Sequence, residues 1–317
     1  MLISSKMNKI LVIGGAGYIG SVLTKDLLDQ GHEVTILDNF RFQQNSLLDC
    51  CHYKNFSVIR GDCRDKSTIS NSIVDQDIII HLAALVGAPL CDTDQIAALS
   101  INLDAIRLLI SLIQPEQKVI FPSTGSGYGA IGSDTLCTEE TPIAPISLYA
   151  RTKIEAEKIL VNRGNSIIFR LSTLFGTSPR MRLDLLVNDF VYRAVHDKSV
   201  ILFESNFKRN FIHVRDISRV FMHGIENFEK MKNNVYNVGL KDANISKKEL
   251  CEKIKTYIPE FVYMESSIGS DPDKRNYVVS TEKIEKTGFL PKFSLDLGIQ
   301  ELIKSFTILG NKKYSNV

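Results

Sequence analysis

The sequence has no strong excess of charge of either sign, and this argues against several classes of partner. Its 317 residues carry 38 Lys and Arg against 36 Asp and Glu, a formal net charge of +2. Basic and acidic residues are interspersed, so we expect neither nucleic-acid binding nor a polybasic membrane contact. With 44% hydrophobic and 23% charged residues, the composition is that of an ordinary globular protein of one large domain or two coupled ones.

Long uninterrupted apolar runs and paired cysteines are also lacking. No window approaches the length of a membrane-spanning helix, and MLISSKMNK runs into a strand without the apolar stretch of a signal peptide. His52 lies beside two adjacent cysteines, which cannot easily chelate one ion together, so we expect no metal and reduced thiols in a cytoplasmic protein. The six cysteines, which form no CxxC pair, are Cys50, Cys51, Cys63, Cys91, Cys137 and Cys251.

The sequence instead has a regular alternation of short apolar runs and helical patterns. Their continuous β-branched character predicts strands buried on both faces, as in a doubly wound parallel α/β sheet. After about residue 175 the alternation loosens, so we expect one domain at 1–175, to which segments around 210–240 return, and a smaller region at 176–317. The predicted strands are 9–15, 33–38, 56–62, 77–84, 118–124 and 166–172, and the predicted helices are about 18–30, 65–74, 92–113 and 147–162.

The first motif with chemical meaning is KILVIGGAGYIG at residues 9–20, which supplies Gly14, Gly17 and Gly20 between a strand and a helix. The first glycine permits a tight turn, the second lets a pyrophosphate approach the backbone, and the third allows close helix packing. The helix N-terminus also attracts the anion. A glycine-rich pattern alone can equally be a simple turn.

A carboxylate further along the chain favours the binding interpretation. The second strand ends at Asp38, about twenty residues after the glycines, where it would accept hydrogen bonds from the adenosine ribose. The order of strand, loop, helix, strand and acid therefore predicts dinucleotide binding. Asp38 would repel a 2′-phosphate, so we expect the protein to bind NAD rather than NADP. The nearby Arg41 leaves NADP as an alternative cofactor.

A tyrosine and a lysine share one face of the predicted helix 147–162. Tyr149 and Lys153 are four residues apart in SLYARTKIEAEKIL, so both can contact one ligand. Tyrosine is a poor base at its reference pKa of ~10. A neighbouring ammonium and a positive nicotinamide ring would both favour the phenolate, which could then take a proton from a hydroxyl. The same pair also occurs by chance in many helices, and only its position behind a dinucleotide loop makes it informative.

Six motifs in order give the chain a resemblance to a known family: GGAGYIG, GDCRD, HLAALVG, STGSGYG, YARTK and RNFIHVRD. Together they resemble the extended short-chain dehydrogenase/reductase family, specifically its NAD-dependent nucleotide-sugar epimerases, dehydratases and dehydrogenases. The resemblance implies a Rossmann domain, NAD as cofactor and a smaller C-terminal substrate-binding region. It implies that Asp62 holds the adenine amino group, that Asn102 lies in the helix beneath the catalytic strand, and that residues 82–84 line the cofactor channel. The expected cofactor-binding residues are Gly14, Gly17, Tyr18, Ile19, Gly20, Asp38, Asn39, Asp62, Cys63, Leu82, Ala83, Ala84, Asn102, Tyr149 and Lys153.

A second glycine-rich stretch, PSTGSGYG at residues 122–129, looks like another phosphate loop. The resemblance implies instead that it carries the catalytic hydroxyl, Thr124, which would bond the sugar oxygen undergoing oxidation. Its glycines would let the backbone pass close to the sugar. Family members that dehydrate their sugar follow this threonine with Asp-Glu, whereas this chain has Gly125 and Ser126, which disfavours a 4,6-dehydratase.

The substrate side is predicted from arginines. Arg209 in KRNFIHVRD matches a family position against the nucleotide diphosphate, and guanidinium groups suit phosphate oxygens. Without the family context, Arg209 and Arg275 would be interpreted as solvated surface arginines, and His213 is expected to be a hydrogen-bonded core residue. Thr173 stands where an asparagine often contacts the diphosphate. The expected substrate-binding residues are Val86, Gly87, Ser126, Thr173, Arg180, Arg182, Arg209 and Arg275.

ALVGAPLCD and SPRMRLDLLVNDFVYRA are similar to a smaller subgroup that oxidises C4 of a GDP-activated heptose for bacterial capsule or surface polysaccharide. This similarity predicts a GDP-sugar 4-dehydrogenase. A nucleotide-sugar 4-epimerase is the alternative, because both begin with the same half-reaction, and a non-catalytic NAD(H)-binding regulator is a weaker one. By analogy, apolar stripes on the helices at 92–113 and 147–162 predict a homodimer, although packing on the sheet explains some of the same residues.

Overall fold

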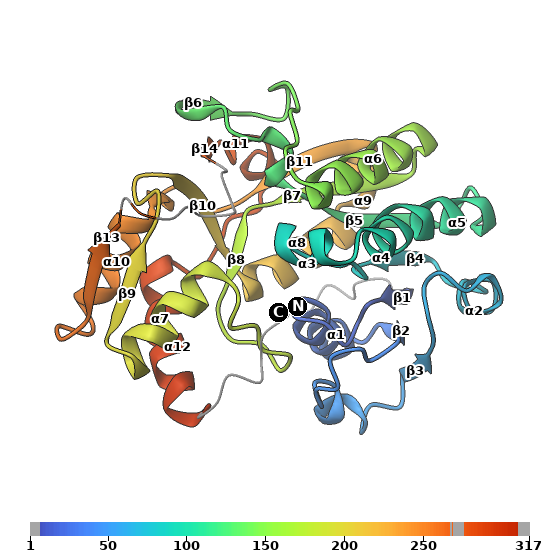
Figure 1. Ribbon diagram of the computed structural model, residues 1–317. Coiled ribbons are helices and arrows are strands. Elements are labelled where there is room, and N and C mark those ends of the chain that lie inside the picture. Colours follow the sequence, from blue (N-terminus) through green and yellow to red (C-terminus); the bar gives the residue numbers. More distant parts are fainter. Residues whose placement is uncertain (1–6, 267, 269–275, 310–317) are drawn as a thin grey trace.

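The computed structural model describes residues 7–266, 268 and 276–309 (Figure 1). Its centre is a seven-stranded sheet in the order β11-β7-β5-β4-β1-β2-β3, in which every neighbouring pair is parallel. The doubly wound Rossmann-type sheet predicted from the sequence is confirmed. Its strands are β1 (Lys9–Ile13), β2 (Glu33–Asp38), β3 (Phe56–Arg60), β4 (Ile78–His81), β5 (Lys118–Thr124), β7 (Ser166–Leu171) and β11 (Asn234–Val238).

Alternate residues of each central strand point into two separate hydrophobic cores. In β1, Ile10 and Val12 pack on the side of α1 and α8, whereas Leu11 and Ile13 pack on the side of α2, α5 and α6. β3 departs from the expectation of burial on both faces: it has β2 as its one sheet neighbour, and Val58 is 48% exposed. The helices that cover the sheet are α1 (Gly20–Asp29), α2 (Lys66–Ser72), α5 (Ala105–Leu112), α6 (Leu148–Arg163), α8 (Val214–Glu226) and α9 (Phe228–Met231).

The helix predicted at 92–113 is more divided than the sequence pattern indicated. A short α3 (Ala88–Thr93) comes first, and α4 (Gln95–Leu99) then continues through a π-helical turn, Ser100–Asp104, into α5. Among the described residues, Gln95–Leu112 is the one stretch long and apolar enough to span a membrane by length and composition, which the sequence reading did not anticipate. Slightly under half of it is buried inside the protein, and core helices pass the same test.

Most elements after β7, other than α8, α9 and β11, lie beside the central sheet together with β6 of the first half (Figure 1). They include a three-stranded sheet of β8 (Thr173–Phe175), β10 (Lys208–His213) and β12 (Asn244–Ser246), with β8 parallel and β12 antiparallel to β10. Two parallel pairs join β9 (Ser199–Leu202) to β13 (Val262–Glu265) and β6 (Gly132–Cys137) to β14 (Tyr277–Val279). The remaining helices are α7 (Leu186–His196), α10 (Lys247–Lys255), α11 (Glu282–Glu285) and α12 (Leu295–Ile308).

Candidate active site

Parallel strands deliver their last residues to one edge of the sheet, where ligands of open α/β sheets bind. At this edge β1 is followed by Gly14, β2 ends at Asp38, β4 is followed by Leu82, and β5 ends at Thr124. Two cavities lie along it. The first is lined by Asp38, Asn39, Asp62 and Cys63 together with Leu82–Leu85, and the second contains Tyr149, Lys153 and Thr124.

The glycine-rich turn brings backbone close to backbone at the junction of these strands. Gly14 has φ +86°, and a Cβ there would lie 2.4 Å from the amide nitrogen of Ala83. A Cβ on Gly20, the first residue of α1, would lie 2.6 Å from the carbonyl oxygen of Gly14. The turn therefore needs glycine both for its left-handed backbone and for the close approach of the helix, as the sequence predicted. Gly17 lines both cavities, and Tyr18, Ile19 and Gly20 line the second.

Asp38 lies at the wall of the first cavity with its carboxylate already oriented. Oδ2 accepts a hydrogen bond from the Ala16 amide at 3.0 Å and Oδ1 accepts one from the Phe40 amide at 2.7 Å. Burial raises the pKa of the Asp38 carboxyl, while these two amides act to lower it. Two oxygens held at fixed positions can still accept hydrogen bonds from a ribose with their remaining lone pairs.

Asp62 lines the same cavity and also binds a neighbouring arginine. Arg64 binds its two carboxylate oxygens in a forked contact, with Nε 2.9 Å from Oδ1 and Nη2 2.7 Å from Oδ2. This contact with Arg64 holds the pKa of Asp62 below its usual value. An adenine amino group would have to bind Asp62 beside Arg64 rather than replace it.

Catalytic candidates converge in the second cavity from two elements. The Ser147 hydroxyl oxygen accepts a hydrogen bond from the Ala150 amide at 3.2 Å and caps α6, which fixes the start of the helix two residues before Tyr149. Tyr149 and Lys153 then lie on one helix face, and both line the cavity with Thr124. The Thr124 hydroxyl donates to Ser126 Oγ at 2.9 Å and accepts from the Ser126 amide at 3.1 Å.

Lys153 is a buried cation. Lys153 is only 3% exposed, and its Nζ lies 3.7 Å from the centroid of the Phe121 ring. Burial lowers the pKa of Lys153 to about 7, and the charge of Glu157 opposes this shift. His81, which is 1% exposed, has its pKa lowered to about 3, first by burial and then by the charge of Lys153, so it is neutral at ordinary pH.

The glycines of PSTGSGYG lie close to other parts of the protein. A Cβ on Gly127 would lie 2.5 Å from Ile154 Cδ1, and one on Gly129 would lie 2.2 Å from the carbonyl oxygen of Ala144. A Cβ on Gly125 would lie 3.0 Å from the Tyr277 hydroxyl oxygen. These glycines allow the stretch to pack against other parts of the protein. Its residues that line the second cavity are Pro122, Ser123, Thr124 and Ser126.

A buried ion pair between Glu157 and Arg170 contacts Ser123 and Tyr128 of this stretch. Glu157, one helical turn after Lys153, accepts hydrogen bonds from Ser123 Oγ at 2.5 Å and from Arg170 Nη2 at 2.6 Å. Arg170 Nη1 also lies 3.1 Å from the Tyr128 hydroxyl. Because Ser123 and Tyr128 flank the loop, this pair links the end of β5 to α6 and fixes Thr124 relative to Tyr149.

The second cavity is also lined by two buried basic residues, Arg209 on β10 and Lys247 at the start of α10, which are 2% and 4% exposed. The hydroxyls of Ser172 and Thr173 line the same cavity and are buried with no hydrogen-bond partner among the described residues. The sequence reading missed Lys247. The one signal that could have identified Lys247 is its place at the first position of a helix, where a positive charge is unfavourable.

Other predicted residues have mixed placements. Val86, Gly87 and Arg182 line the second cavity, with Arg182 paired to Asp184, and Arg180 lines both cavities. Asn102, predicted to bind the cofactor, is instead 2% exposed and clamps the backbone of Leu85, accepting from its amide at 2.8 Å and donating to its carbonyl at 3.0 Å. It holds the loop after β4 and lines neither cavity. Arg275 lies outside the described residues.

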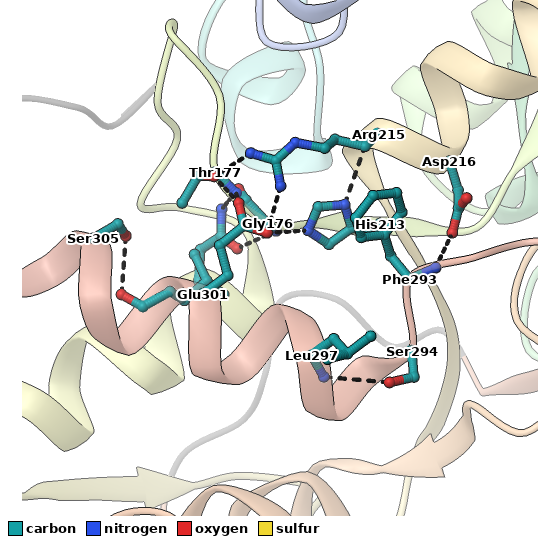
Figure 2. Close-up of polar contacts among 12 residues, drawn as sticks. Gly176, Thr177, His213, Arg215, Asp216, Phe293, Ser294, Leu297, Glu301 and Ser305 are labelled. Atoms are coloured by element: carbon teal, nitrogen blue, oxygen red, sulfur yellow. Dashed lines mark hydrogen bonds and ion pairs between the residues drawn. The ribbon is translucent and has the colours of Figure 1, made fainter.

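His213 is a core residue, as the sequence predicted, and belongs to the polar cluster in Figure 2. It is fully buried and stacked on Phe293, with ring centroids 4.8 Å apart. Nδ1 accepts a hydrogen bond from the Arg215 amide at 3.2 Å, and Nε2 lies 3.1 Å from Glu301 Oε2. Glu301 of α12 also binds the guanidinium of Arg215 at 2.6 Å and the hydroxyl of Thr177. Within the described part of the chain, no group of three or more His, Cys, Asp or Glu is placed to hold a metal ion.

Comparisons with known proteins agree with this geometry. Over 309 residues the chain is 25% identical to the low-salt glycan biosynthesis protein Agl12 of Haloferax volcanii, covering 93% of this chain and 97% of that protein. It is 24% identical to UDP-glucose 4-epimerase of Corynebacterium glutamicum, covering 97% and 98%. The crystal structure of Thermus thermophilus UDP-glucose 4-epimerase with NAD has the same fold at a TM-score of 0.82, with 24% identity over 94% of this chain and 99% of that one. Residues 10–239 match the model of the NAD dependent epimerase/dehydratase family, and the chain therefore belongs to this family of NAD-dependent enzymes.

Proposed function

We propose that this enzyme uses NAD to oxidise C4 of a nucleotide-activated sugar. The observation that carries the proposal is the meeting of three groups in one cavity: the glycine-rich turn, the set Thr124, Tyr149 and Lys153, and the cations Arg209 and Lys247. These would hold, respectively, the dinucleotide, the reacting sugar hydroxyl and the substrate diphosphate. The unpartnered hydroxyls of Ser172 and Thr173 supply further donors for a polar ligand.

The residues present suit the proposed chemistry. Thr124 and Tyr149 would bind the C4 oxygen, and Tyr149 as phenolate would take its proton. Lys153 would stabilise the phenolate by its charge and orient the nicotinamide ribose through its N–H groups. NAD, when bound, accepts the hydride from C4. With Glu157 and Arg170 fixing the β5 loop, Thr124 and Tyr149 are held in place before the sugar binds, which is the condition for efficient proton transfer.

The more specific proposal is a GDP-heptose 4-dehydrogenase of bacterial capsule or surface polysaccharide synthesis. It rests on the similarity of ALVGAPLCD and SPRMRLDLLVNDFVYRA to enzymes of that subgroup. Both stretches contribute to the second cavity, through Val86 to Leu90 and through Arg180 to Asp189. The segment that carries the similarity is therefore also in contact with the space that the sugar would fill.

A nucleotide-sugar 4-epimerase is the second candidate. Relatives of similar overall length include proteins named as UDP-glucose 4-epimerases, for example in Corynebacterium glutamicum and, as a putative assignment, in Methanocaldococcus jannaschii. An epimerase would use the same Thr124, Tyr149 and Lys153 for its first half-reaction and would then return the hydride to the other face of the sugar.

Measuring NADH formed per sugar converted separates the two candidates. The protein is incubated with NAD and either GDP-D-glycero-D-manno-heptose or a UDP-hexose. The products are identified by mass spectrometry and NMR. About one NADH per converted GDP-heptose supports the dehydrogenase, because the keto-sugar is released and the hydride from C4 stays on NADH. Epimerised product with almost no net NADH would support the epimerase. Tight NAD binding with no conversion of any nucleotide sugar would contradict both and favour a regulator.

We also propose a division of labour and an assembly. Residues 1–175, with segments around 210–240, would bind NAD, and the rest of residues 176–317 would mainly bind the nucleotide sugar. The protein would be a cytoplasmic homodimer. Ile96 and Leu99 of α4 are 83% and 43% exposed and give this helix an apolar face that a second copy could cover. Light scattering of Ile96→Glu against the unchanged protein tests the dimer, because a charge at a dimer contact should yield monomers.

A further inference from the structure

Arg180 lies where the two cavities meet. The residues that line both are Gly14, Gly17, Phe42, Leu82, Ala84 and Arg180. A dinucleotide with its adenosine beside Asp38 and its nicotinamide beside Tyr149 must pass its diphosphate through this junction. The junction already contains the glycine-rich turn before α1, a ten-residue helix, whose N-terminus favours an anion. Arg180 is the cationic side chain among the shared residues.

The guanidinium of Arg180 is enclosed rather than solvated. The residue is 2% exposed, and its Cζ lies 3.9 Å from the centroid of the Phe42 ring. Burial, followed by the charge of Arg182, lowers the pKa of Arg180 to about 10, and the carboxylates of Asp184 and Asp38 oppose this shift. Arg180 therefore remains a cation at neutral pH, in surroundings where electrostatic attraction to an anion is stronger than in water.

The backbone that carries Arg180 is attached to the glycine-rich turn. Tyr18 Oη donates to the carbonyl oxygen of Gly176 at 2.6 Å, and Ser178 Oγ donates to the carbonyl oxygen of Tyr18 at 2.7 Å. The hydroxyls of Ser178 and Ser21 lie 3.0 Å apart. In the same segment, the backbone amide of Thr177 donates a hydrogen bond to the carboxylate of Glu301 in α12 (Figure 2). The segment is thus fixed to the cofactor side of the junction.

We infer that Arg180 binds the diphosphate of NAD, not the diphosphate of the sugar nucleotide. The substrate diphosphate has its own candidate cations in Arg209 and Lys247, which line the second cavity but not the first. The inference rests on the NAD dependence of the family and on the junction. It does not depend on which sugar is oxidised, so it can fail or succeed independently of the proposed activity.

The Phe42 contact extends this role. Phe42 belongs to the loop after β2. In the same loop, Gln44 Nε2 donates a hydrogen bond to the carbonyl oxygen of Met181 at 3.4 Å. The two loops therefore meet over the junction, with Arg180 and Phe42 as their contact. A diphosphate beneath this contact would be held by Arg180 from one side and by the amides of the glycine-rich turn from the other.

Calorimetric titration of Arg180→Gln with dissected ligands tests the inference. NAD and ADP-ribose, which contain the diphosphate, should bind about tenfold or more weakly than to the unchanged protein. Adenosine, which lacks it, and GDP and UDP, which probe the substrate site, should keep affinities within about twofold. Weakened GDP or UDP binding with unchanged ADP-ribose binding would overturn the inference and return Arg180 to the substrate.

Two further variants keep the result interpretable. Arg107→Gln removes an exposed arginine of α5 that lines neither cavity, so it should leave ADP-ribose binding within about twofold. Arg180→Lys keeps the charge but loses the fork, so it should restore part of the ADP-ribose affinity. Thermal unfolding without ligand identifies a folding defect. If Arg180→Gln unfolds, Arg180→Lys carries the test, and ADP-ribose affinity equal to that of the unchanged protein would then contradict the inference.

Discussion

Burial determines the electrostatic behaviour of Lys153. In the unfolded chain its pKa is near 10.5, whereas in the folded protein burial lowers it to about 7. Between these two values the unfolded chain binds more protons than the folded protein, so this group makes the protein more stable as pH rises through that window. At and below pH 7 the cost of burying the charge is fully present.

Lys153→Met should therefore stabilise the cofactor-free protein, by roughly 1–3 kcal/mol at pH 6 to 7, with the gain shrinking towards pH 10. Urea unfolding of both proteins at several pH values measures this. A gain that is constant with pH would mean that better packing, not removal of a buried charge, is responsible. Activity should be lost in the variant, since Lys153 is proposed to orient the cofactor and stabilise the phenolate.

Tyr149→Phe should abolish oxidation of the sugar and leave NAD affinity near that of the unchanged protein, because it removes only the proposed proton acceptor. Single-turnover formation of NADH and a separate NAD titration measure the two properties. Ser126→Ala is a useful comparison: Ser126 shares the cavity and bonds Thr124, so its loss should reduce turnover without eliminating it. A Tyr149→Phe protein that retains most of its turnover would remove the proposed mechanism.

Asp38 should give a preference for NAD over NADP of about tenfold or more in affinity, because its charge opposes a 2′-phosphate. Asp38→Asn should reduce the preference, since the amide keeps the shape and loses the charge. Binding of both dinucleotides to both proteins is the measurement. Tighter binding of NADP than NAD to the unchanged protein would show that Arg41 governs the ribose site instead.

At the scale of elements, α12 is joined to the site by Glu301. Its carboxylate receives the Thr177 amide and hydroxyl and the Arg215 guanidinium, and it faces His213 (Figure 2). Burial acts against ionisation, but His213 and Arg215 together hold the pKa of Glu301 below its usual value. One carboxylate thus links α12 to β10, to α8 and to the segment that leads to Arg180.

Glu301→Gln should lower the free energy of unfolding by about 1–3 kcal/mol at pH 7. Because the folded pKa is depressed, the stabilisation is present above the unfolded pKa of about 4.3 and is lost as pH falls through the lower folded value. The difference between the two proteins should therefore disappear in acid. Glu282→Gln, which breaks an exposed pair with Lys286 on α11, is the control and should cost no more than about 0.5 kcal/mol.

Element positions were largely predictable from sequence, and contacts between elements were not. The strands 33–38 and 118–124 have the predicted bounds because β-branched runs between turn residues are a local signal. Phe42 and Lys247 escaped prediction because their roles arise from loops and helices brought together by the fold. The contacts of Asn102 and of the glycines of PSTGSGYG could not be predicted for the same reason: their partners, Leu85, Ile154 and Ala144, are distant in sequence.

At the scale of the whole molecule, the reaction outcome depends on a carboxylate pair that the β5 loop does not have. Gly125 and Ser126 follow Thr124, so no acid and base stand there to remove water from C5 and C6 of a keto-sugar. The product should weigh two hydrogens less than the substrate for a dehydrogenase, or the same for an epimerase, as checked by mass spectrometry. Loss of a water would contradict this and require an acid and a base elsewhere, for which Cys137 and Glu139 are candidates.

The edge strand β11 has a consequence for how the chain is made. It pairs with β7 from Asn234↔Ile167 to Val238↔Leu171, so more than sixty intervening residues must be synthesised before the sheet is complete. Until then β7 presents an unpaired edge of buried residues, the kind of surface on which nascent chains aggregate. The Rossmann sheet therefore cannot be completed until residue 238 has emerged from the ribosome, although six of its seven strands end before residue 172.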